Sequence, residues 1–243
     1  MSNLVMTRPG LMPIIATPPR FHTPLWTPGQ PAYLDDPALR FHLDLSQQGQ
    51  GNQFLSHDRI GHVVTNINAT ATGQGAWSFN GVTSCLTVPS HPALLVAGPF
   101  TLLGWVWSDD WTIPNERHTI MRVATGCGLS INTNGTICMF YYDGGGWQAQ
   151  WAGSSVVPVN RWNHVVGLWD GSRIRVYLNG LPDATTTATT VAPVMFGGIT
   201  IGSNSTVTER FRLMMAMTNY LSRALSPQEV AEAYWQTKGR FGG

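Results

Sequence analysis

Residues 161–180 read RWNHVVGLWDGSRIRVYLNG, and this stretch decides the fold class. Its two halves, Trp162–Trp169 and Ser172–Leu178, are rich in β-branched and aromatic residues, which favour extended strands. The dipeptide after each half, Asp-Gly at 170–171 and Asn-Gly at 179–180, tolerates the positive φ that tight turns between antiparallel strands require. In the second half, apolar and polar residues alternate with period two. The stretch therefore predicts an antiparallel hairpin with one face on a core and the other in water or on a ligand.

The same pattern of short strands and turns extends over the chain after residue 75. Two more turn dipeptides occur, Asn-Gly at 80–81 and at 134–135, and the second predicts a two-residue turn that pairs Thr133 with Thr136. Many short strands with almost no helix are typical of a two-sheet antiparallel sandwich or a barrel. The expected strands are 76–79, 84–88, 100–107, 118–124, 128–132, 136–142, 148–152, 162–169, 172–178, 199–202 and 211–221.

One short helix is expected near the end of the chain. The segment SPQE at 226–229 forms a capping box with proline at the first helical position. Val230, Ala233 and Tyr234 then make an apolar stripe, and Gly239 ends it. We expect this helix to lie against the sandwich.

The first 34 residues contain seven prolines. Proline lacks a backbone donor and disfavours helix in the residue before it, so residues 1–34 are expected to form an extended arm ahead of a body at 35–243. An ordered arm is held either by its own body or by a partner, and the sequence leaves both open. The arm side chains expected to bind a partner are Leu11, Ile14, Ile15, Phe21, Leu25 and Trp26.

Charged side chains make up only 11% of the 243 residues, and the formal net charge is +1. No basic field is present to attract a phosphate backbone, so we expect no nucleic-acid partner. A weakly charged surface suits association, so we expect an assembly, with a homo-oligomer as one form of it. The sequence has no basic leader followed by an apolar run, and no apolar stretch long enough to cross a bilayer. We therefore expect no signal peptide, synthesis in the cytoplasm and no membrane partner.

Several motifs occur in the order and spacing of one known family. They are Asp-Leu-Ser at 44–46, AWSFNGVTSCLTV at 76–88, FTLLGWVW at 100–107, RWNHVVGLW at 161–169, the Tyr-x-Asn-Gly hairpin at 170–180, Ile-Gly at 201–202 and LSRALSPQEVAEAY at 221–234. Together they resemble the laminin-G-like jelly rolls of the concanavalin A-like lectin and glucanase superfamily, from about Asp44 to Trp235. The resemblance implies an all-β, two-sheet antiparallel jelly-roll sandwich. It implies no activity, because this fold serves many functions.

Catalysis and cofactors are not expected. Glucanases of the superfamily carry Glu-x-Asp-x-x-Glu on one strand, because a retaining mechanism needs two carboxyl groups about 5.5 Å apart. None of the four glutamates, Glu116, Glu209, Glu229 and Glu232, lies in that pattern. A rim Ca²⁺ is the alternative to no cofactor, because hard cations need several oxygen ligands; the acids available for it are Asp109, Asp110, Asp143 and Asp170. The cysteines Cys85, Cys127 and Cys138 have no metal-ligand spacing and are expected to be buried free thiols.

Two sets of loop residues are candidates for binding a sugar, which needs an exposed aromatic ring with polar groups beside it. One set is Trp111 with Asp109 and Asp110. The other surrounds the glycines at 144–146 and consists of Tyr142, Asp143, Trp147 and Trp151. Tryptophan and tyrosine are also favoured at protein interfaces, so composition does not separate sugar from protein as the ligand. Trp105, Trp162 and His164 are expected to be structural.

Three functions follow as hypotheses. The first is a non-enzymatic structural protein of a phage virion, a capsid decoration or cement protein whose arm holds neighbouring subunits such as the major capsid protein. The proline-rich arm, the body and the Phe-Gly-Gly tail together resemble phage virion proteins of this fold. The second is a lectin-like module that binds carbohydrate on the host cell surface. The third is a glycoside-active enzyme.

Overall fold

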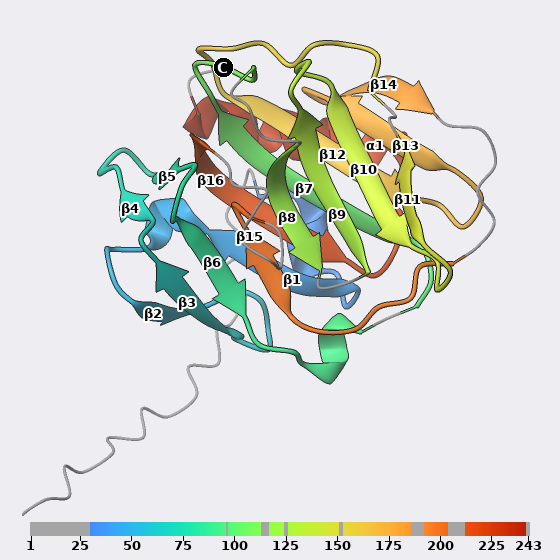
Figure 1. Cartoon of the computed structure of the whole chain (residues 1–243), viewed down its shortest axis with the longest axis horizontal. Helices are drawn as coiled ribbons and strands as arrows, with labels where there is room; N and C mark the ends of the chain where they lie inside the picture. The colour runs from blue at the N-terminus through green and yellow to red at the C-terminus, as the bar shows by residue number, and fades with distance from the viewer. Residues whose placement is uncertain are drawn as a thin grey trace, which may run out of the picture.

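The computed structural model describes residues 30–95, 97–112, 117–123, 126–150, 153–185, 192–203 and 212–241. Their strands form two antiparallel sheets that face each other (Figure 1). Sheet A has the order β14 (Leu181–Thr185), β13 (Ile174–Leu178), β12 (Asn163–Trp169), β7 (Phe100–Trp107), β16 (Arg212–Leu221), β5 (Trp77–Asn80) and β4 (Thr70–Ala71), with β1 (Leu39–Asp44) also paired to β16. Sheet B has the order β11 (Trp147–Gln150), β10 (Ile137–Tyr142), β9 (Cys127–Asn132), β8 (Arg117–Val123), β15 (Ile199–Ile201), β6 (Cys85–Val88), β3 (Val63–Ile67) and β2 (Gln53–Leu55). The predicted all-β jelly-roll sandwich is confirmed.

The main core lies between the two sheets and follows from the alternation in the strands. Leu102 and Val106 of β7 belong to it, as do Met139 and Tyr141 of β10, and all four are buried. Ile174 of β13 belongs to the same core, as the alternation at 172–178 predicts. Burying apolar side chains from both inner faces is what holds two such sheets together.

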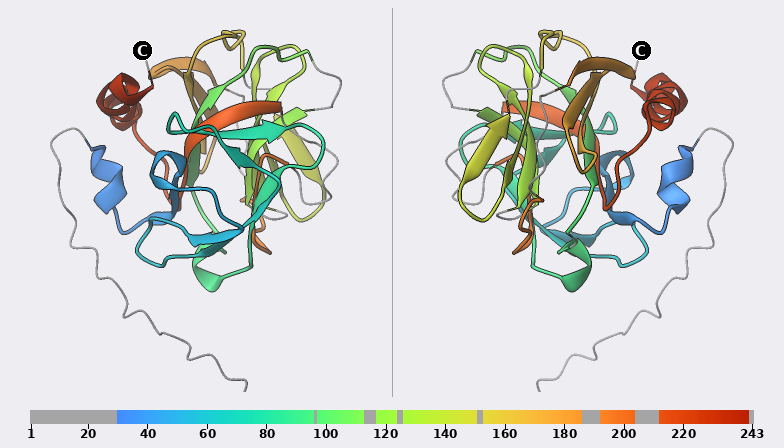
Figure 2. Two further views of the ribbon diagram at one scale, coloured as in Figure 1. Left: turned by 90° about the vertical axis from the view of Figure 1, so that its left-hand side faces the viewer. Right: turned by 90° about the vertical axis from the view of Figure 1, so that its right-hand side faces the viewer.

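The outer face of sheet A carries a second apolar cluster. The C-terminal helix α1 (Pro227–Thr237) and the short 3₁₀ helix η1 (Ala32–Asp35) lie on that side of the sandwich (Figure 2). Val230 and Ala233 of α1 are buried there, and the capping box between Ser226 and Glu229 is formed in both directions. The predicted helix and its position are therefore confirmed. Among the described residues no helix covers the outer face of sheet B.

The second apolar cluster changes one expectation for the hairpin at residues 161–180. Tyr177 lies on the face of β13 predicted to be wet or to contact a ligand, but it is buried in the second cluster. Arg173 is exposed and Arg175 is half-buried on that same face. The face is thus partly covered by the protein itself.

The turn dipeptides behave in two ways. Asn179 and Gly180 have φ of 52° and 81° and join β13 directly to β14, as a two-residue turn predicts. The prediction for residues 134–135 is wrong, because Ile131 pairs with Ile137 and leaves a longer connection. The dipeptide at 80–81 also makes no hairpin, since β5 belongs to sheet A and β6 to sheet B. Its asparagine side chain instead accepts the backbone N–H groups of residues 82–84, which stabilises the crossing.

The last residues of the predicted arm, 30–34, are part of the packed body. Tyr33 is buried in the second cluster, and its hydroxyl accepts a hydrogen bond from Asn219 Nδ2 at 3.3 Å. Residues 1–29, with all six arm side chains predicted to bind a partner, lie outside the described residues. The division of the chain into an arm and a body stays a prediction. The cysteines Cys85, Cys127 and Cys138 are buried thiols that form no disulfide, as expected.

Candidate functional site

The turn between β10 and β11 brings three of the predicted sugar-binding residues together. Tyr142 is directly opposite Trp147 in the strand pair, and their ring centroids are 5.5 Å apart. Asp143 Oδ1 accepts the backbone N–H groups of Gly145 and Gly146, each at 2.9 Å. Asp143 thus closes the turn with its own carboxylate, so its role here is to position the two rings.

These rings lie on the outer face of sheet B. Met139 and Tyr141 point into the core, so Phe140 and Tyr142 point the other way. Phe140 lies over Gly128 of β9, where an added Cβ would approach the ring to 2.3 Å. Gly128 therefore makes room for a buried ring beneath Trp147. The Trp147 side chain itself is 42% exposed.

Two arginines support these rings, and of the two Arg122 is buried and Arg117 is half-buried. The guanidinium of Arg122 lies 4.3 Å from the centroid of Trp147, and that of Arg117 lies 5.1 Å from the centroid of Phe140. Phe196 is exposed and meets Tyr142 edge to face, with centroids 6.2 Å apart. Cation–π contacts of this kind hold an exposed indole in one orientation. We call Arg117, Arg122, Phe140, Tyr142, Trp147 and Phe196 the aromatic–arginine cluster.

The second set of predicted sugar-binding residues does not form a site. Trp111 is only 3% exposed, and its Nε1 donates a 2.7 Å hydrogen bond to the carbonyl of Val157. A ring buried in this way cannot stack on a sugar, so the prediction for Trp111 is wrong. Asp109 is exposed and forms an ion pair with Arg212 at 3.0 Å.

The two predicted sets also lie at opposite ends of sheet B. Val157, the partner of Trp111, hydrogen-bonds to the backbone of Gly135, at the turn that precedes β10. Tyr142 is at the other end of β10. Seven residues of strand at roughly 3.3 Å per residue put these ends about 23 Å apart. Trp151, the remaining predicted residue, lies outside the described residues.

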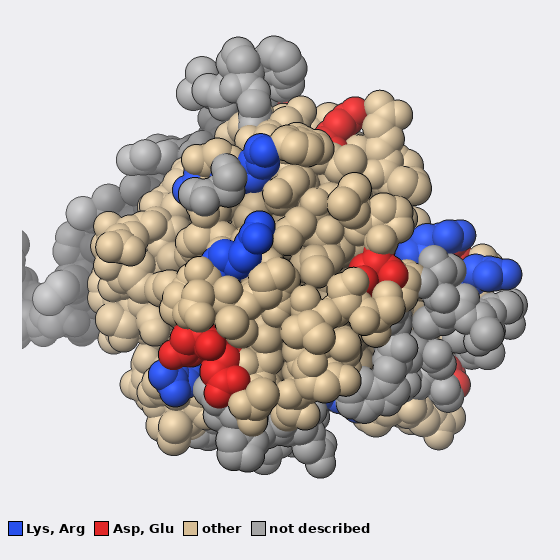
Figure 3. Space-filling model, turned by 90° about the horizontal axis from the view of Figure 1, so that it is seen from above, with Lys and Arg blue, Asp and Glu red and all other residues tan. Residues whose placement is uncertain are grey.

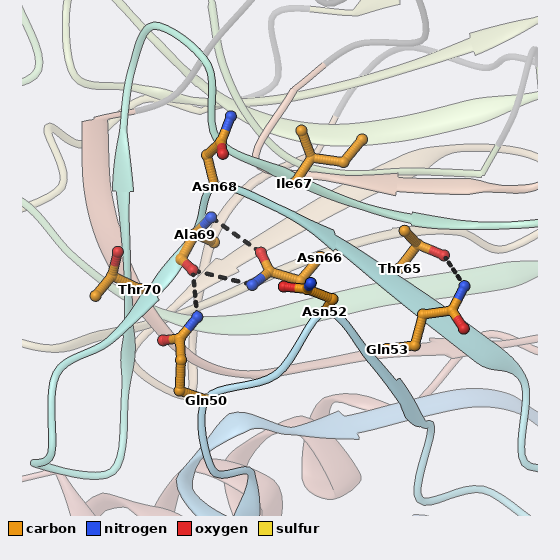
Figure 4. A pocket seen from close by; sticks show the side chains of 9 residues that line it. All are labelled: Gln50, Asn52, Gln53, Thr65, Asn66, Ile67, Asn68, Ala69 and Thr70. Carbon is orange, nitrogen blue, oxygen red and sulfur yellow. Dashed lines mark hydrogen bonds between the residues drawn. The ribbon is translucent and has the colours of Figure 1, made fainter.

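A polar pocket that the sequence did not predict lies at the other edge of sheet B (Figure 4). Its volume is about 750 Å³. Gln50 and Asn66 are fixed in it by hydrogen bonds to the backbone, including two that end on the carbonyl of Ala69. We call this the amide pocket. Its lining residues are Gln50, Asn52, Gln53, Thr65, Asn66, Ile67, Asn68, Ala69 and Thr70.

A buried network of histidines and aspartates was also missed by sequence reasoning. His42 Nδ1 hydrogen-bonds to Asn219 Oδ1, and the backbone N–H of His42 donates to Asp58. Burial lowers the pKa of His42 to about 4, although the bond to Asn219 opposes this. The network joins β1 to β16 and to the segment at 56–62. Since His42 and Asp58 are both buried, we interpret it as structural.

The acids considered for catalysis or calcium binding are engaged locally. Glu229 accepts hydrogen bonds from Arg223, which holds the pKa of Glu229 at about 2, and Glu232 lies on the same helix. Glu116 and Glu209 lie outside the described residues. Asp110 and Asp170 each accept hydrogen bonds from their own loops. Within the described ranges, no group of three or more His, Cys, Asp or Glu side chains is arranged to hold a metal ion.

Surface charge and hydropathy do not point to one of these candidate sites over another. The view from above shows a few basic and acidic side chains, some of them side by side, scattered over a mostly uncharged surface (Figure 3). In the part of the chain that the structure describes, no helix has both the length and the apolar character needed to cross a bilayer.

Comparisons with known proteins agree with the observed architecture. A family profile described as the concanavalin A-like lectin/glucanases superfamily matches residues 79–231. The botulinum neurotoxin serotype G binding domain superposes with a TM-score of 0.61 at 17% identity, over 81% of this chain and 50% of that one. The serotype D binding domain gives 0.62 at 16% identity, over 82% and 51%. A Trypanosoma rangeli sialidase gives 0.63 at 18% identity, over 85% and 34%. No curated protein matches the chain.

The chain thus spans about half of the two toxin binding domains and about a third of the sialidase. At such identities the likeness concerns the fold alone. The profile match covers well over half of the 243 residues and follows the sandwich from β5 into α1.

Proposed function

The chain belongs to the concanavalin A-like lectin/glucanase superfamily, and from this premise we propose that it is a non-enzymatic carbohydrate-binding protein whose contact site is the aromatic–arginine cluster. The observation that carries the proposal is Trp147, a half-exposed indole held on a sheet face by Arg122 and by a closed turn. An aromatic ring fixed at the surface offers an apolar platform to the C–H face of a sugar, while guanidinium and hydroxyl groups beside it bond sugar hydroxyls.

The names of the structural neighbours support a binding role. Two of them are described as binding domains of neurotoxins, and a third is a sialidase. Binding therefore agrees with more of these neighbours than catalysis does. Glycoside hydrolysis remains the third hypothesis, and it predicts that one carboxylate variant abolishes hydrolysis of a polysaccharide that the wild type degrades.

The experiment is glycan-array binding by the full chain and by Trp147→Ala. We expect the variant to lose binding while its midpoint of thermal unfolding stays within a few degrees of the wild type. Trp235→Ala is the matched control, because Trp235 is 62% exposed on α1 and stacks on Lys238 at 3.6 Å, far from the cluster in the fold. Equal loss of binding in both variants would contradict the site.

A place on a phage virion is the second candidate, with the major capsid protein and further copies of the chain as partners and cell-surface glycans as ligands of the exposed body. The supporting observation is that the C-terminal end of the arm is fixed to the body, since Tyr33 is buried in the second cluster. The test is deletion of residues 1–29, which keeps Tyr33. This variant should fold and still bind glycans, but should no longer join the particle, and continued incorporation would contradict the tether.

A further inference from the structure

The hairpin of β2 and β3, at one end of sheet B, carries exposed aliphatic side chains (Figure 1). Leu55 pairs directly with Val63, and their side chains are 57% and 45% exposed. Residues opposite each other in an antiparallel pair point to the same face, so these two lie side by side. Ile60, in the turn between the strands, is 41% exposed, and its neighbour Gly61 lies against Leu55 Cδ1. We call Leu55, Ile60 and Val63 the hairpin strip.

Hydrogen bonds fix the turn that carries Ile60. Asp58 Oδ1 accepts the backbone N–H groups of Ile60 and Gly61, at 3.0 and 3.1 Å. Asp58 Oδ2 accepts the hydroxyl of Ser56, whose oxygen in turn accepts the backbone N–H of His62 at 2.7 Å. Ser56 and Asp58 are both buried. The turn therefore holds Ile60 at the surface.

The backbone of β2 is also open on one side. The N–H of Ser56 donates to the carbonyl of His62 at 2.8 Å. Further along the pair, the N–H of Asn66 donates to the carbonyl of Asn52 at 2.8 Å. Alternate residues of an antiparallel strand bond to the partner strand, so Leu55 directs its N–H and C=O away from β3. Among the described strands β2 is the last of sheet B, and natural proteins cover such open edges.

The described part of the chain begins close to this hairpin. Arg59, next to Ile60, donates from its guanidinium to the backbone carbonyl of Asp35 at the end of η1. A 3₁₀ helix rises about 2.0 Å per residue, so Gln30 lies within roughly 12 Å of Asp35. An extended chain advances up to about 3.5 Å per residue, so Trp26 can lie about 14 Å beyond Gln30. The end of the arm can therefore reach the hairpin strip of its own chain.

The last residues of the arm match the strip in chemistry. Residues 20–28 read RFHTPLWTP, in which Leu25 and Trp26 are the apolar pair nearest to Gln30. Proline at 24 favours an extended residue before it, as addition to a strand edge requires. A segment tethered this close to its acceptor has a millimolar effective concentration, which the arm of a second copy does not reach in dilute solution. The same-chain arm is thus the favoured occupant.

We propose that the last part of the N-terminal arm, with Leu25 and Trp26 as its anchors, packs on the hairpin strip and along the open edge of β2 in its own chain. This inference goes beyond the proposed function and does not rest on it. The aromatic–arginine cluster lies toward the β11 end of sheet B, whereas the strip lies at the β2 end. In the virion candidate, the arm leaves the strip before it holds a neighbouring subunit.

The test measures how well the arm shields Ile60 in the full chain. A reporter made by Ile60→Cys is alkylated with iodoacetamide, and the three native thiols are buried. Its reaction is compared between the wild-type arm and the arm variant Leu25→Ser/Trp26→Ser. Burial of two large apolar side chains should outweigh the cost of ordering a few residues, so the reporter should react about fivefold or more slowly with the wild-type arm.

Two controls match these changes. Leu181→Cys places the same reporter at a 70% exposed leucine of β14, at the end of sheet A, and it should react equally with both arms. Leu4→Ser/Val5→Ser removes two apolar side chains from the other end of the arm and should leave the Ile60→Cys reporter shielded. Thermal unfolding of each variant shows that it is folded.

A second measurement leaves the strip unaltered. In the wild-type full chain, methyl NMR should show nuclear Overhauser effects between the Trp26 ring and the methyl groups of Leu55, Ile60 or Val63. Their absence would overturn the docking, even if the reporter itself disturbs the strip.

The remaining outcomes identify the occupant. Equal alkylation of Ile60→Cys with both arms would overturn the inference. Shielding that grows with protein concentration, together with a doubled mass in light scattering, would assign the strip to a second copy and overturn the same-chain contact. Loss of shielding in Leu4→Ser/Val5→Ser alone would overturn the choice of anchors. Glycan binding should be unchanged in Leu25→Ser/Trp26→Ser, so failure here leaves Trp147 as a sugar site.

Discussion

The outer faces of the two sheets each carry a tryptophan, and the two differ in exposure and in partners. On sheet A, Trp105 is buried, donates from Nε1 to Thr237 Oγ1 at 2.8 Å and stacks on Tyr234 of α1. On sheet B, Trp147 has an arginine as its stacking partner and remains half exposed. The difference arises from what covers each face, since α1 and η1 lie only on sheet A. For these two tryptophans, the presence or absence of a covering helix on the outer face decides whether the ring is buried or half exposed.

The largest expected effect on the free energy of unfolding concerns Trp105, the buried tryptophan of this comparison. Trp105→Ala should lower the free energy of unfolding by about 3–5 kcal/mol, because it opens a cavity beneath α1 and leaves the Thr237 hydroxyl without its donor. Trp147→Ala should cost less than about 1 kcal/mol, since its site can relax into solvent. Denaturant unfolding of the two variants checks this contrast, and equal losses would refute it.

A pH effect is expected to follow from the same buried layer. His164 contacts the rings of both Trp105 and Tyr234, and burial lowers the pKa of His164 to about 3. The unfolded chain binds this proton near pH 6.5, so stability falls as the pH drops from 6.5 toward 3, by about 1.4 kcal/mol per pH unit. Burial of His42 acts in the same direction.

Unfolding measured between pH 7 and pH 4 checks the histidine account. His164→Gln should unfold with a visibly weaker dependence on pH than the wild type, whatever its stability at pH 7. His91→Gln, at an exposed histidine, serves as the control and should keep the wild-type slope. An unchanged slope in His164→Gln would show that other groups cause the acid instability.

A smaller effect is expected beneath the exposed tryptophan. Gly128→Ala places a methyl group where the Phe140 ring lies, so it should cost about 1–3 kcal/mol and displace the ring that supports Trp147. Binding of glycans should weaken together with stability. Gly49→Ala, which meets nothing within 4 Å, should change neither. Full binding by a stable Gly128→Ala variant would mean that Phe140 does not position Trp147.

Local signals in the sequence predicted the elements that local chemistry decides. The capping box fixes where α1 begins, and the Asn179–Gly180 turn needs only two residues with positive φ. Resemblance to the family supplied the order of the strands. By contrast, β1, β2, β3, β4 and β14 were not among the expected strands. β2 and β4 have three and two residues, which are too few for period-two patterning to show.

The candidate site could be predicted only in part, because burial and register are long-range properties. Loop aromatics pointed to Trp147, whose ring is half exposed, but the same reasoning chose Trp111, whose ring is buried. Nothing local distinguishes these two residues. The outer face of sheet B joins residues from 53 to 200 and depends on strand pairing that no local pattern specifies.

The most direct test of a ligand-binding face on sheet B is NMR of the indole N–H groups during titration with the best-binding neutral polysaccharide, each signal being assigned by a Trp→Phe variant. We predict that the Trp147 signal shifts in proportion to saturation while those of Trp105 and Trp235 stay in place. A shift of Trp235 with Trp147 unmoved would place the ligand on the helix side and contradict the account.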